Sequence, residues 1–512
     1  MKKKLLTRVL CCLLAYLLLV VLLFLAESRS PASSIRTLGD AFWYSLVTLT
    51  TVGYGDLVPR TAAGRFIGVL FVCLSIGFLS LLIGSFAALA GRHLLPILAL
   101  RIGHGKTRYL FTCDSPIAEG ICLELLKDKQ NQVIICAASA SVSHGGRCVR
   151  ITLAPTELPR RARPLLRRTV VVLPGEDEAE NLRLAALLQE HCERIFCLAS
   201  GEVPGFAQRV SFFNPVDCCA RQYWQEHPLT PGEETLLIIG DGPWAQALLE
   251  RGLLVNVLHP EQQLRYHVFG NWQDFCLDRP ELGSVLSLNE ERSHRDALLC
   301  HDAPWNADPE LVRRAQRIII CEEDPSRGWQ TLCCLRRGFS SEAAVYLRTP
   351  QGLPGVLCFG TTRRLYSPEL VFHSGLDDRA RQLHGLYLRS VGKASPAWDE
   401  LSSFARDSNI AAADHLLTKL RILLPREDVR AITPENCQRA AESYRQGYEA
   451  NAALFEEIEH IRWCRYHYLN GWRYAPERND ALRLHPCLVP FGELSPEEKQ
   501  KDDNAWLQIA QL

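Results

Sequence analysis

Two long apolar segments near the N-terminus constrain the fold of this chain most strongly. Residues 5–26, LLTRVLCCLLAYLLLVVLLFLA, contain a single charged residue, and residues 66–90, FIGVLFVCLSIGFLSLLIGSFAALA, contain none. A helix of about 20 apolar residues spans the hydrocarbon core of a bilayer. The sequence therefore predicts two membrane spans, at about 5–26 and 66–90.

The charges that flank these segments predict their orientation. Lys2, Lys3 and Lys4 precede the first segment as they would in a secretory signal, but its apolar stretch exceeds the usual 7 to 15 or so residues and no clear cleavage site follows. Arg92 and Arg101 follow the second segment. Because positive charge stays on the cytoplasmic side, we expect a two-pass protein of a plasma or inner membrane with both termini in the cytoplasm.

The segment between the spans contains the motif TTVGYGD at residues 50–56. Residues 39–50 are too few to cross a bilayer, so we expect a short helix that enters it partway. Irregular backbone at that depth is tolerated only where protein shields it or where it lines an aqueous cavity. Glycines 53 and 55 would let successive carbonyl groups point toward one axis.

The order of span, short helix, TTVGYGD and span resembles the two-transmembrane potassium channels. The resemblance implies a filter of Thr51, Val52, Gly53, Tyr54 and Gly55, in which the carbonyl oxygens of the first four bind potassium ions. It also implies a homotetramer, because one chain supplies one quarter of the filter.

Three more residues of this region receive expected roles. Asp56 would lie at the outer mouth of the filter. Gly77 and Gly84 in the second span are candidate gate hinges. Glycine in a membrane helix equally serves close helix packing, so both interpretations of these two residues stay open.

Charge and cysteine content narrow the function of the remaining residues. Up to His104 there are ten Lys and Arg against three Asp and Glu, which leaves 47 against 54 of the 57 of each for the rest. This mildly acidic part is not expected to bind nucleic acid. Seventeen of the twenty cysteines follow residue 104 without a CxxC pair, and a reducing compartment disfavours disulfides, so we expect small buried apolar residues.

Apolar strands alternate with helical segments in two similar parts of the chain. The pattern occurs in residues 108–138 and 168–200, and again in 235–260 and 315–349. Such alternation indicates a parallel sheet with helices on both faces. Each part resembles the RCK domain, the regulator of potassium conductance, and the two doubly wound α/β domains are predicted at 105–230 and 231–350.

A glycine-rich turn follows the first strand of the second part. Gly240, Gly242 and Ala245 match the dinucleotide fingerprint with alanine as its third member, and the next strand is expected to end at His259, where an acid normally holds a ribose. The first part has Cys113-Asp114-Ser115-Pro116 instead of glycines. Nucleotide binding at Gly240, Gly242, Ala245 and His259 and a purely structural turn both fit this pattern.

Two kinds of charge cluster lie in the same region. Glu176-Asp177-Glu178 and Glu322-Glu323-Asp324 each follow a strand, where they would start a helix with favourable charge or, alternatively, bind calcium. The arginines of LPRRARPLLRRT, residues 158–169, form either a solvated face or a site for lipid headgroups or another anion.

A helical connector is predicted at 351–430, and a small all-α domain at 431–512. The anchors Trp463, Gly471-Trp472, Tyr474, His485-Pro486 and Phe491 resemble the RyR domain of ryanodine receptors. These aromatic residues form either the core of the domain or a pocket that stacks a planar, nucleotide-like ligand. The candidate pocket residues are Arg462, Trp463, Trp472, Tyr474 and His485.

Together, the resemblances imply a tetrameric, potassium-selective channel in a lipid bilayer, with a helical pore domain at 1–104 and cytoplasmic domains that sense a small-molecule ligand. Potassium is the permeant ion, a nucleotide-derived signal is one candidate for the ligand, and no catalytic cofactor is expected. The alternatives are a membrane-tethered nucleotide-binding oxidoreductase, for which no convincing acid/base group is evident, and a regulatory subunit of potassium uptake.

Overall fold

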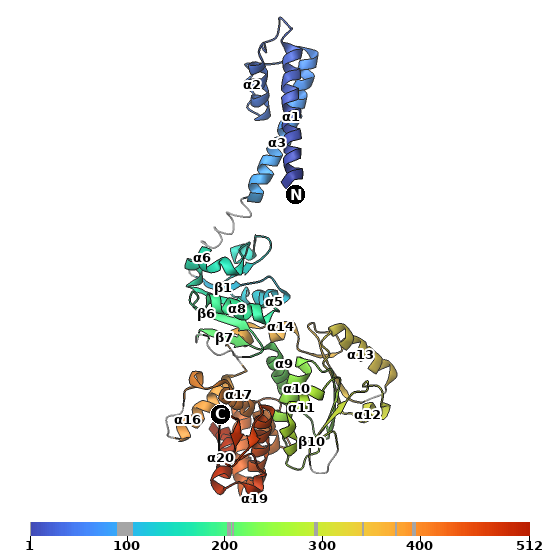
Figure 1. Ribbon diagram of the computed structural model, residues 1–512, viewed down its shortest axis with the longest axis vertical. Helices are drawn as coiled ribbons and strands as arrows, with labels where there is room; N and C mark the ends of the chain where they lie inside the picture. Colours follow the sequence, from blue (N-terminus) through green and yellow to red (C-terminus); the bar gives the residue numbers. More distant parts are fainter. Residues whose placement is uncertain are drawn as a thin grey trace. The chain divides into compact units, whose positions relative to one another are not determined.

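The computed structural model describes residues 2–89, 106–201, 206, 209–290, 295–339, 342–373, 376–391 and 396–511 (Figure 1). The chain divides into two compact units. The smaller unit comprises Met1–Gly105 and Ala137–Thr152, and the larger one Lys106–Cys136 and Leu153–Leu512.

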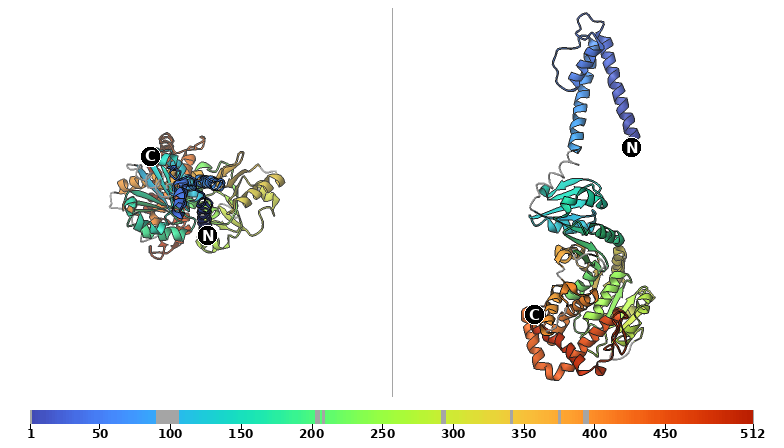
Figure 2. Two further views of the ribbon diagram at one scale, coloured as in Figure 1. Left: turned by 90° about the horizontal axis from the view of Figure 1, so that it is seen from above. Right: turned by 60° about the vertical axis from the view of Figure 1, so that its left-hand side comes forward.

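Three helices form the N-terminal part of the smaller unit: α1 (Lys2–Glu27), α2 (Leu38–Leu49) and α3 (Ala62–Leu89). The short α2 packs beside the two long helices (Figures 1 and 2). A capping box starts α2, because the Thr37 hydroxyl accepts the N–H of Asp40 and the Asp40 carboxylate accepts the N–H of Thr37. The short helix predicted at 39–50 is therefore present.

No helix within the described part of the chain is long and apolar enough to cross a membrane. The predicted spans at 5–26 and 66–90 coincide with α1 and α3, and residue 90 of the second span, Arg92 and Arg101 lie outside the described residues.

A β-hairpin completes the smaller unit. Its strands β3 (Ser141–Ser143) and β4 (Cys148–Ile151) pair antiparallel and are joined through the 3₁₀ turn His144–Gly146.

The larger unit contains strands of the first sheet in the order β2-β1-β5-β6-β7, all of them paired in parallel. The strands are β1 (Thr107–Phe111), β2 (Asn131–Cys136), β5 (Thr169–Leu173), β6 (Arg194–Leu198) and β7 (Val210–Phe213). The helices that connect them are α5 (Pro116–Leu125), α6 (Leu158–Arg161), α7 (Arg163–Leu166) and α8 (Glu178–Leu188).

The second sheet has seven strands in the order β10-β11-β9-β8-β12-β13-β14, again all parallel. The strands are β8 (Thr235–Ile239), β9 (Arg265–Phe269), β10 (Ser287–Leu288), β11 (Ala297–His301), β12 (Arg317–Ile320), β13 (Ala344–Arg348) and β14 (Leu357–Phe359). The helices are α10 (Pro243–Val255), α11 (Gln273–Leu277), α12 (Pro309–Arg314) and α13 (Pro325–Gly338). Two parallel α/β sheets are thus present, as the sequence predicts.

One predicted strand of the second part is wrong. The apolar run LLVNVL before His259 does not form a strand, because α10 continues to Val255 and the next strand begins only at Arg265. Leu253, Leu254 and Val255 are all buried, since α10 packs against helices on more than one side. A helix buried all round has the same continuous apolar pattern as a buried strand, which explains the error.

The segment that was predicted as a connector belongs partly to the first sheet. After β14, the short helices α14 (Thr362–Leu365) and α15 (Pro368–His373) pack against α5 (Figure 1). The ring centroid of Phe372 lies 5.1 Å from that of Tyr109 and 4.9 Å from that of Phe196. The chain therefore crosses from the first sheet to the second through α9 (Pro215–Glu226) and then returns.

The C-terminal part is mainly helical. Its helices are α16 (Asp378–Val391), α17 (Ser403–Asp414), α18 (Leu416–Leu423), α19 (Pro434–Leu469) and α20 (Pro496–Leu507). Two-residue strands, β15 (Arg473–Tyr474) and β16 (Leu484–His485), also pair here. The prediction that the last domain is all α-helical is therefore wrong. Further 3₁₀ turns of the larger unit are Pro155–Glu157, Pro280–Ser284, Trp398–Glu400, Phe491–Glu493 and Gln508–Gln511.

A buried ion pair joins the last helical domain to the second sheet. The guanidinium of Arg465 on α19 lies 2.7 Å from the carboxylate of Asp296, and both side chains are buried. Asp296 also accepts the backbone N–H of Leu264 at the start of β9. Removing one partner of such a pair leaves an uncompensated buried charge.

We therefore predict that Arg465→Met lowers the free energy of unfolding of the full chain in detergent by about 3–5 kcal/mol. The matched control is Arg473→Met, because Arg473 and Glu281 join the same two parts through a more exposed pair at 3.3 Å. This control should change stability by less than about 0.5 kcal/mol. Denaturant titration followed by tryptophan fluorescence measures both, and equal effects of the two substitutions would contradict the prediction.

Candidate functional site

The sign of the backbone angle φ alternates along residues 51–55. Thr51, Gly53 and Gly55 have φ of 60°, 59° and 74°, whereas Val52 and Tyr54 between them do not have positive φ. This alternation turns successive carbonyl groups toward one side. Positive φ is costly for a β-branched residue such as Thr51, by about 1–3 kcal/mol, and such strain persists only where the surroundings impose it.

Hydrogen bonds to α2 hold this segment in place. The backbone N–H groups of Val52 and Gly53 both donate to the carbonyl of Val47, at 3.0 and 3.3 Å. The indole N–H of Trp43 donates to Asp56 at 3.0 Å and keeps the pKa of Asp56 below its usual range. The Trp43 and Tyr54 rings stack at 6°, and Tyr54 remains 69% exposed in a single chain.

Glu27 is a residue of this region to which the sequence analysis gave no role. Its fully buried carboxylate accepts the N–H groups of Arg60 and Thr61 and the Thr61 hydroxyl, at 3.0, 2.8 and 2.6 Å. Although burial raises the pKa of Glu27, these hydrogen bonds lower it to about 2. Glu27 thus ties the end of α1 to the start of α3. An acid directly behind a long apolar segment was the available signal.

The hinge candidates Gly77 and Gly84 both lie within α3. A Cβ atom built at either position would meet nothing within 4 Å among the described residues of the chain. Packing within one subunit therefore does not account for either glycine.

The glycine turn after β8 depends on close backbone approach. Gly240 has φ of 126°, and a Cβ atom there would lie 2.4 Å from the carbonyl oxygen of Cys321. A Cβ atom on Gly242 would lie 2.1 Å from the Glu323 carboxylate, so a negative charge occupies the start of α10. A phosphate would need this same helix N-terminus.

His259 does not complete this turn. It lies exposed in the loop that leads into the N-terminal end of β9, whereas Gly240 follows the C-terminal end of the parallel neighbouring strand β8. His259 was therefore wrongly placed at a strand end beside the glycines. Ala245, by contrast, is buried in α10 directly after the turn.

The acidic clusters start helices, as predicted. The side chain of Asp177 accepts the N–H of Glu180 at the start of α8, and that of Asp324 accepts the N–H of Ser326 at the start of α13. In the described ranges, no group of three or more His, Cys, Asp or Glu residues is placed to hold a metal ion. The arginines between 160 and 168 are exposed on the short helices α6 and α7 and in the turn that follows.

The final domain brings three of the five predicted pocket residues together around a histidine. The ring centroids of Trp463 and Trp472 lie 3.8 and 5.2 Å from that of His467, and Trp463 lies 4.9 Å from His485. Burial lowers the pKa of His467 to about 3. His467, four residues after Trp463 on α19, was missed because the sequence analysis searched for stacking rings around the GWRY turn.

The other two predicted pocket residues point elsewhere. Tyr474 is 56% exposed. Arg462 is buried and pairs with Glu459, which also lies 2.9 Å from the ammonium group of Lys419. Burial and the nearby Glu459 raise the pKa of Asp502 beside this cluster to about 8.

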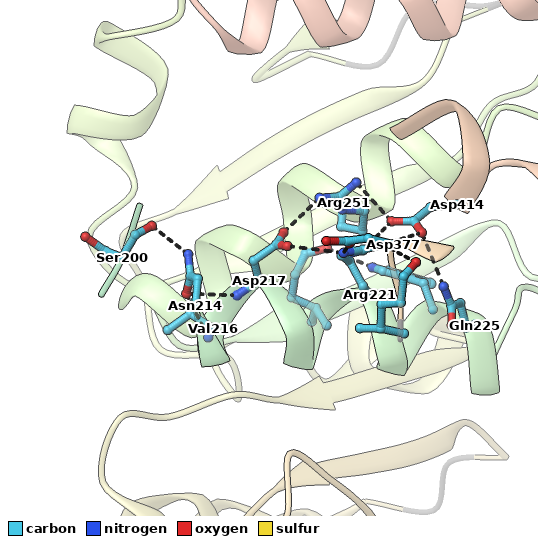
Figure 3. A network of polar contacts seen from close by, with 12 residues as sticks. Ser200, Asn214, Val216, Asp217, Arg221, Gln225, Arg251, Asp377 and Asp414 are labelled. Atoms are coloured by element: carbon cyan, nitrogen blue, oxygen red, sulfur yellow. Dashed lines mark hydrogen bonds and ion pairs between the residues drawn. The ribbon is translucent and has the colours of Figure 1, made fainter. Parts of the chain in front are cut away.

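A second network of charges, in which Arg221 and Asp414 are buried, joins α9, α10 and α17 (Figure 3). Arg221 on α9 lies 2.8 Å from Asp414 at the end of α17 and 2.6 Å from Asp377. Arg251 on α10 contacts the same Asp414 at 3.0 Å and Asp217 on α9 at 2.8 Å. The helix that links the two sheets is thereby attached to the C-terminal helices.

Side chains from the C-terminal part also cap the last carbonyl groups of α10. Arg465 donates to the carbonyl of Leu253 and the Thr418 hydroxyl to that of Val255, at 2.9 and 2.6 Å. His415 donates at 2.9 Å to the carbonyl of Val257, two residues beyond the end of the helix. The terminal carbonyls of a helix otherwise lack partners, so these contacts fix both elements in one geometry.

Comparisons with known proteins identify the two ends of the chain. Residues 9–91 match the family model described as ion channel, and residues 443–511 match the RyR domain. A voltage-gated potassium channel of Aeropyrum pernix is 46% identical over 63 residues, which are 12% of this chain and 21% of that protein. The human A-type voltage-gated potassium channel KCND3 is 44% identical over 55 residues, which are 11% of this chain and 8% of that protein.

The matched segments thus span about a fifth or less of each relative. Among solved structures, the GsuK channel has a TM-score of 0.34 at 16% identity and covers 73% of this chain and 99% of its own. The GsuK channel bound to NAD has a TM-score of 0.33 at 13% identity, with 74% and 85% covered. Scores this low support no statement about the fold or ligands of this chain. The predicted channel and RyR resemblances are nevertheless confirmed by the family matches.

The raised pKa of Asp502 predicts a pH-dependent stability. Its value of about 8 in the folded protein exceeds the ordinary 3.8, so the folded state binds more protons between these pH values and stability falls as pH rises toward 8. We expect this residue to lower stability by about 1.3 kcal/mol per pH unit between about pH 5 and 7, and by about half as much per pH unit at pH 8.

Asp502→Asn should remove this contribution. Asp480→Asn, which alters an exposed carboxylate paired with Arg478, should leave it unchanged. Denaturant titrations of the full chain at several pH values compare the slopes, and the same slope in wild type and Asp502→Asn would contradict the assignment.

Proposed function

We propose that this chain is the subunit of a potassium-selective channel in which four copies surround one pore. The observation that carries the proposal is the alternating backbone of Thr51, Gly53 and Gly55 directly behind α2, within a segment that matches the ion channel family. In one subunit this segment is open on one side, as the exposure of Val52 and Tyr54 indicates. Three further copies would close it into rings of carbonyl oxygens.

The residues of the proposed filter have separate roles. The carbonyl groups of Thr51, Val52, Gly53 and Tyr54 would replace the hydration shell of potassium, with Gly55 completing the turn to Asp56. The strain at Thr51 is held by the bonds that Val52 and Gly53 make to Val47. The Trp43–Tyr54 stack and the Trp43–Asp56 hydrogen bond would set the width of the filter from behind.

We further propose that the larger unit gates the pore in response to a small molecule. A ligand shifts such a gate only by the difference between its affinities for the two states. The buried networks around α9, α10 and α17 make the C-terminal part and the link between the sheets one mechanical element. Motion in that element would reach α3, where Gly77 and Gly84 are the candidate hinges.

A nucleotide-derived signal is the first class of ligand to test. The ring cluster of Trp463, His467, Trp472 and His485 offers aromatic faces on which a base could stack. The Gly240 turn is the weaker candidate, because Glu323 places a carboxylate where a phosphate would bind. The matched families are an ion channel and a RyR domain, and neither points to an oxidoreductase.

Gly53→Ala tests the filter. Alanine is disfavoured at φ of 59°, and the altered backbone would turn a carbonyl group out of its ring. We expect the ratio of potassium to sodium flux through the purified full chain in liposomes to fall at least tenfold.

Gly39→Ala is the matched control, because Gly39 lies at the start of α2 without positive φ, and a Cβ atom there would make only an ordinary contact with the Thr37 hydroxyl at 3.5 Å. It should leave the flux ratio unchanged. A channel that keeps its selectivity with Gly53→Ala would contradict the filter assignment, and wild-type protein without potassium flux under any condition would contradict the function itself.

Asp414→Asn tests the gating route. The amide leaves Arg221 and Arg251 without the shared charge that joins α9, α10 and α17. We expect potassium flux without added ligand to change at least threefold, while the potassium-to-sodium ratio stays as in wild type. Asp428→Asn, which alters an exposed carboxylate paired with Arg430, should change neither quantity. Unaltered flux in folded, tetrameric Asp414→Asn protein would contradict the proposal that gating passes through this network.

A further inference from the structure

Two cysteine thiols meet on one face of the second sheet. Cys276 lies in α11 and Cys300 in β11, and their Sγ atoms are 3.3 Å apart although 24 residues separate them in the chain. Side chains alternate along a strand, so Cys300 shares a face with Leu298, whereas His301 turns to the other face. The helix α11 lies over the face that carries Cys300, which brings Cys276 to it.

This pair differs from the other cysteines of the chain. The eighteen cysteines from Cys73 onward are free thiols, and nine of them are buried, in keeping with a role as small apolar residues. Cys276 and Cys300 are instead partly exposed and in contact with each other. Neither contributes to the filter, the glycine turn or the buried charge networks described above.

The surroundings of the two sulfur atoms are unequal. Either sulfur can donate in this contact. The contact with Cys300 and the guanidinium of Arg279 lower the pKa of Cys276 to about 7 despite partial burial. The same contact, burial and the carboxylate of Asp302 raise the pKa of Cys300. Cys276 is therefore the sulfur atom with thiolate character near neutral pH, and the thiolate is the reactive form of cysteine.

We propose that Cys276 and Cys300 form an oxidisable dithiol, a modification site that a hydroperoxide converts into an intramolecular disulfide. The Cys276 thiolate attacks one peroxide oxygen, the O–O bond breaks, and a sulfenic acid and hydroxide form. The sulfur of Cys300 then attacks the sulfenic sulfur and displaces its hydroxyl group. The two thiol protons combine with the two OH groups of hydrogen peroxide and leave as two molecules of water, so each sulfur loses one electron and hydrogen peroxide gains two.

The disulfide would affect the turn at Gly240 through Trp272. The backbone N–H of Cys276 donates to the carbonyl of Trp272 at 3.3 Å, and the fully buried indole of Trp272 donates to the carbonyl of Gly240 at 3.2 Å. A covalent link from α11 to β11 would hold this chain of contacts in one arrangement. Disulfides in a reducing compartment are usually transient and redox-sensing, which suits a partly exposed pair. The assignment does not depend on the proposed channel activity.

The test treats the reduced full chain in detergent with hydrogen peroxide at one to ten equivalents, followed by alkylation of free thiols, digestion and mass spectrometry. We expect the alkylated forms of Cys276 and Cys300 to disappear together, with a linked peptide two hydrogen atoms lighter than the sum of its parts. Dithiothreitol should restore both thiols. Cys334, an exposed cysteine on α13, is the internal control and should react at least fivefold more slowly.

Two single variants separate the steps. With Cys300→Ser the reaction should stop at a Cys276 sulfenic acid that dimedone traps, and with Cys276→Ser the Cys300 thiol should survive the same treatment. Equal rates at Cys276 and Cys334, or loss of Cys276 to sulfinic acid without a linked peptide in wild-type protein, would overturn the proposal. Because the readout is chemical, it stands or falls separately from any result on ion flux.

Discussion

The burial of α10 is the constraint on which the larger unit depends. This helix packs against α9, α17 and α19, and its residues Gly252–Val255 are buried. Two of its last carbonyl groups accept hydrogen bonds from side chains of α18 and α19, and His415 bonds the carbonyl of Val257 just beyond the helix. A buried helix end without partners is costly, so the C-terminal domain stabilises this end of α10.

The charged side chains around α10 fix the relative positions of the helices more than they stabilise the fold. Taking Arg221, Arg251 and Asp414 out of water costs several kcal/mol for each ion, and the mutual attraction returns this only where the geometry is good. What the network supplies is one fixed arrangement of three helices from distant parts of the chain (Figure 3). Fixed contacts also set the conformation of the segment after α2. The strain at Thr51 is tolerated only while the carbonyl of Val47 and the Trp43 side chain hold its neighbours.

How far the sequence predicts this protein varies with the range of the interaction. Capping and periodicity act within a few residues. They therefore predicted the helix that precedes the TTVGYGD motif, the helix starts at Asp177 and Asp324, and the parallel sheets. The strand expected before His259 failed because burial on all sides erases the difference between helix and strand. Arg462 lies outside the predicted ring cluster because it pairs with Glu459, which also binds Lys419 from a distant part of the chain.

The sequence by itself determined the segments that suit a membrane, the alternating glycines of the motif and the two kinds of domain that follow, since composition and short-range spacing carry that information. Only the tertiary structure decided that Glu27 joins α1 to α3, that Trp472 and His485 lie against His467, and that Cys276 meets Cys300. Each of these contacts joins residues whose approach is set by packing of whole elements or by the turn between them. Such approach leaves no periodic trace in the order of the amino acids.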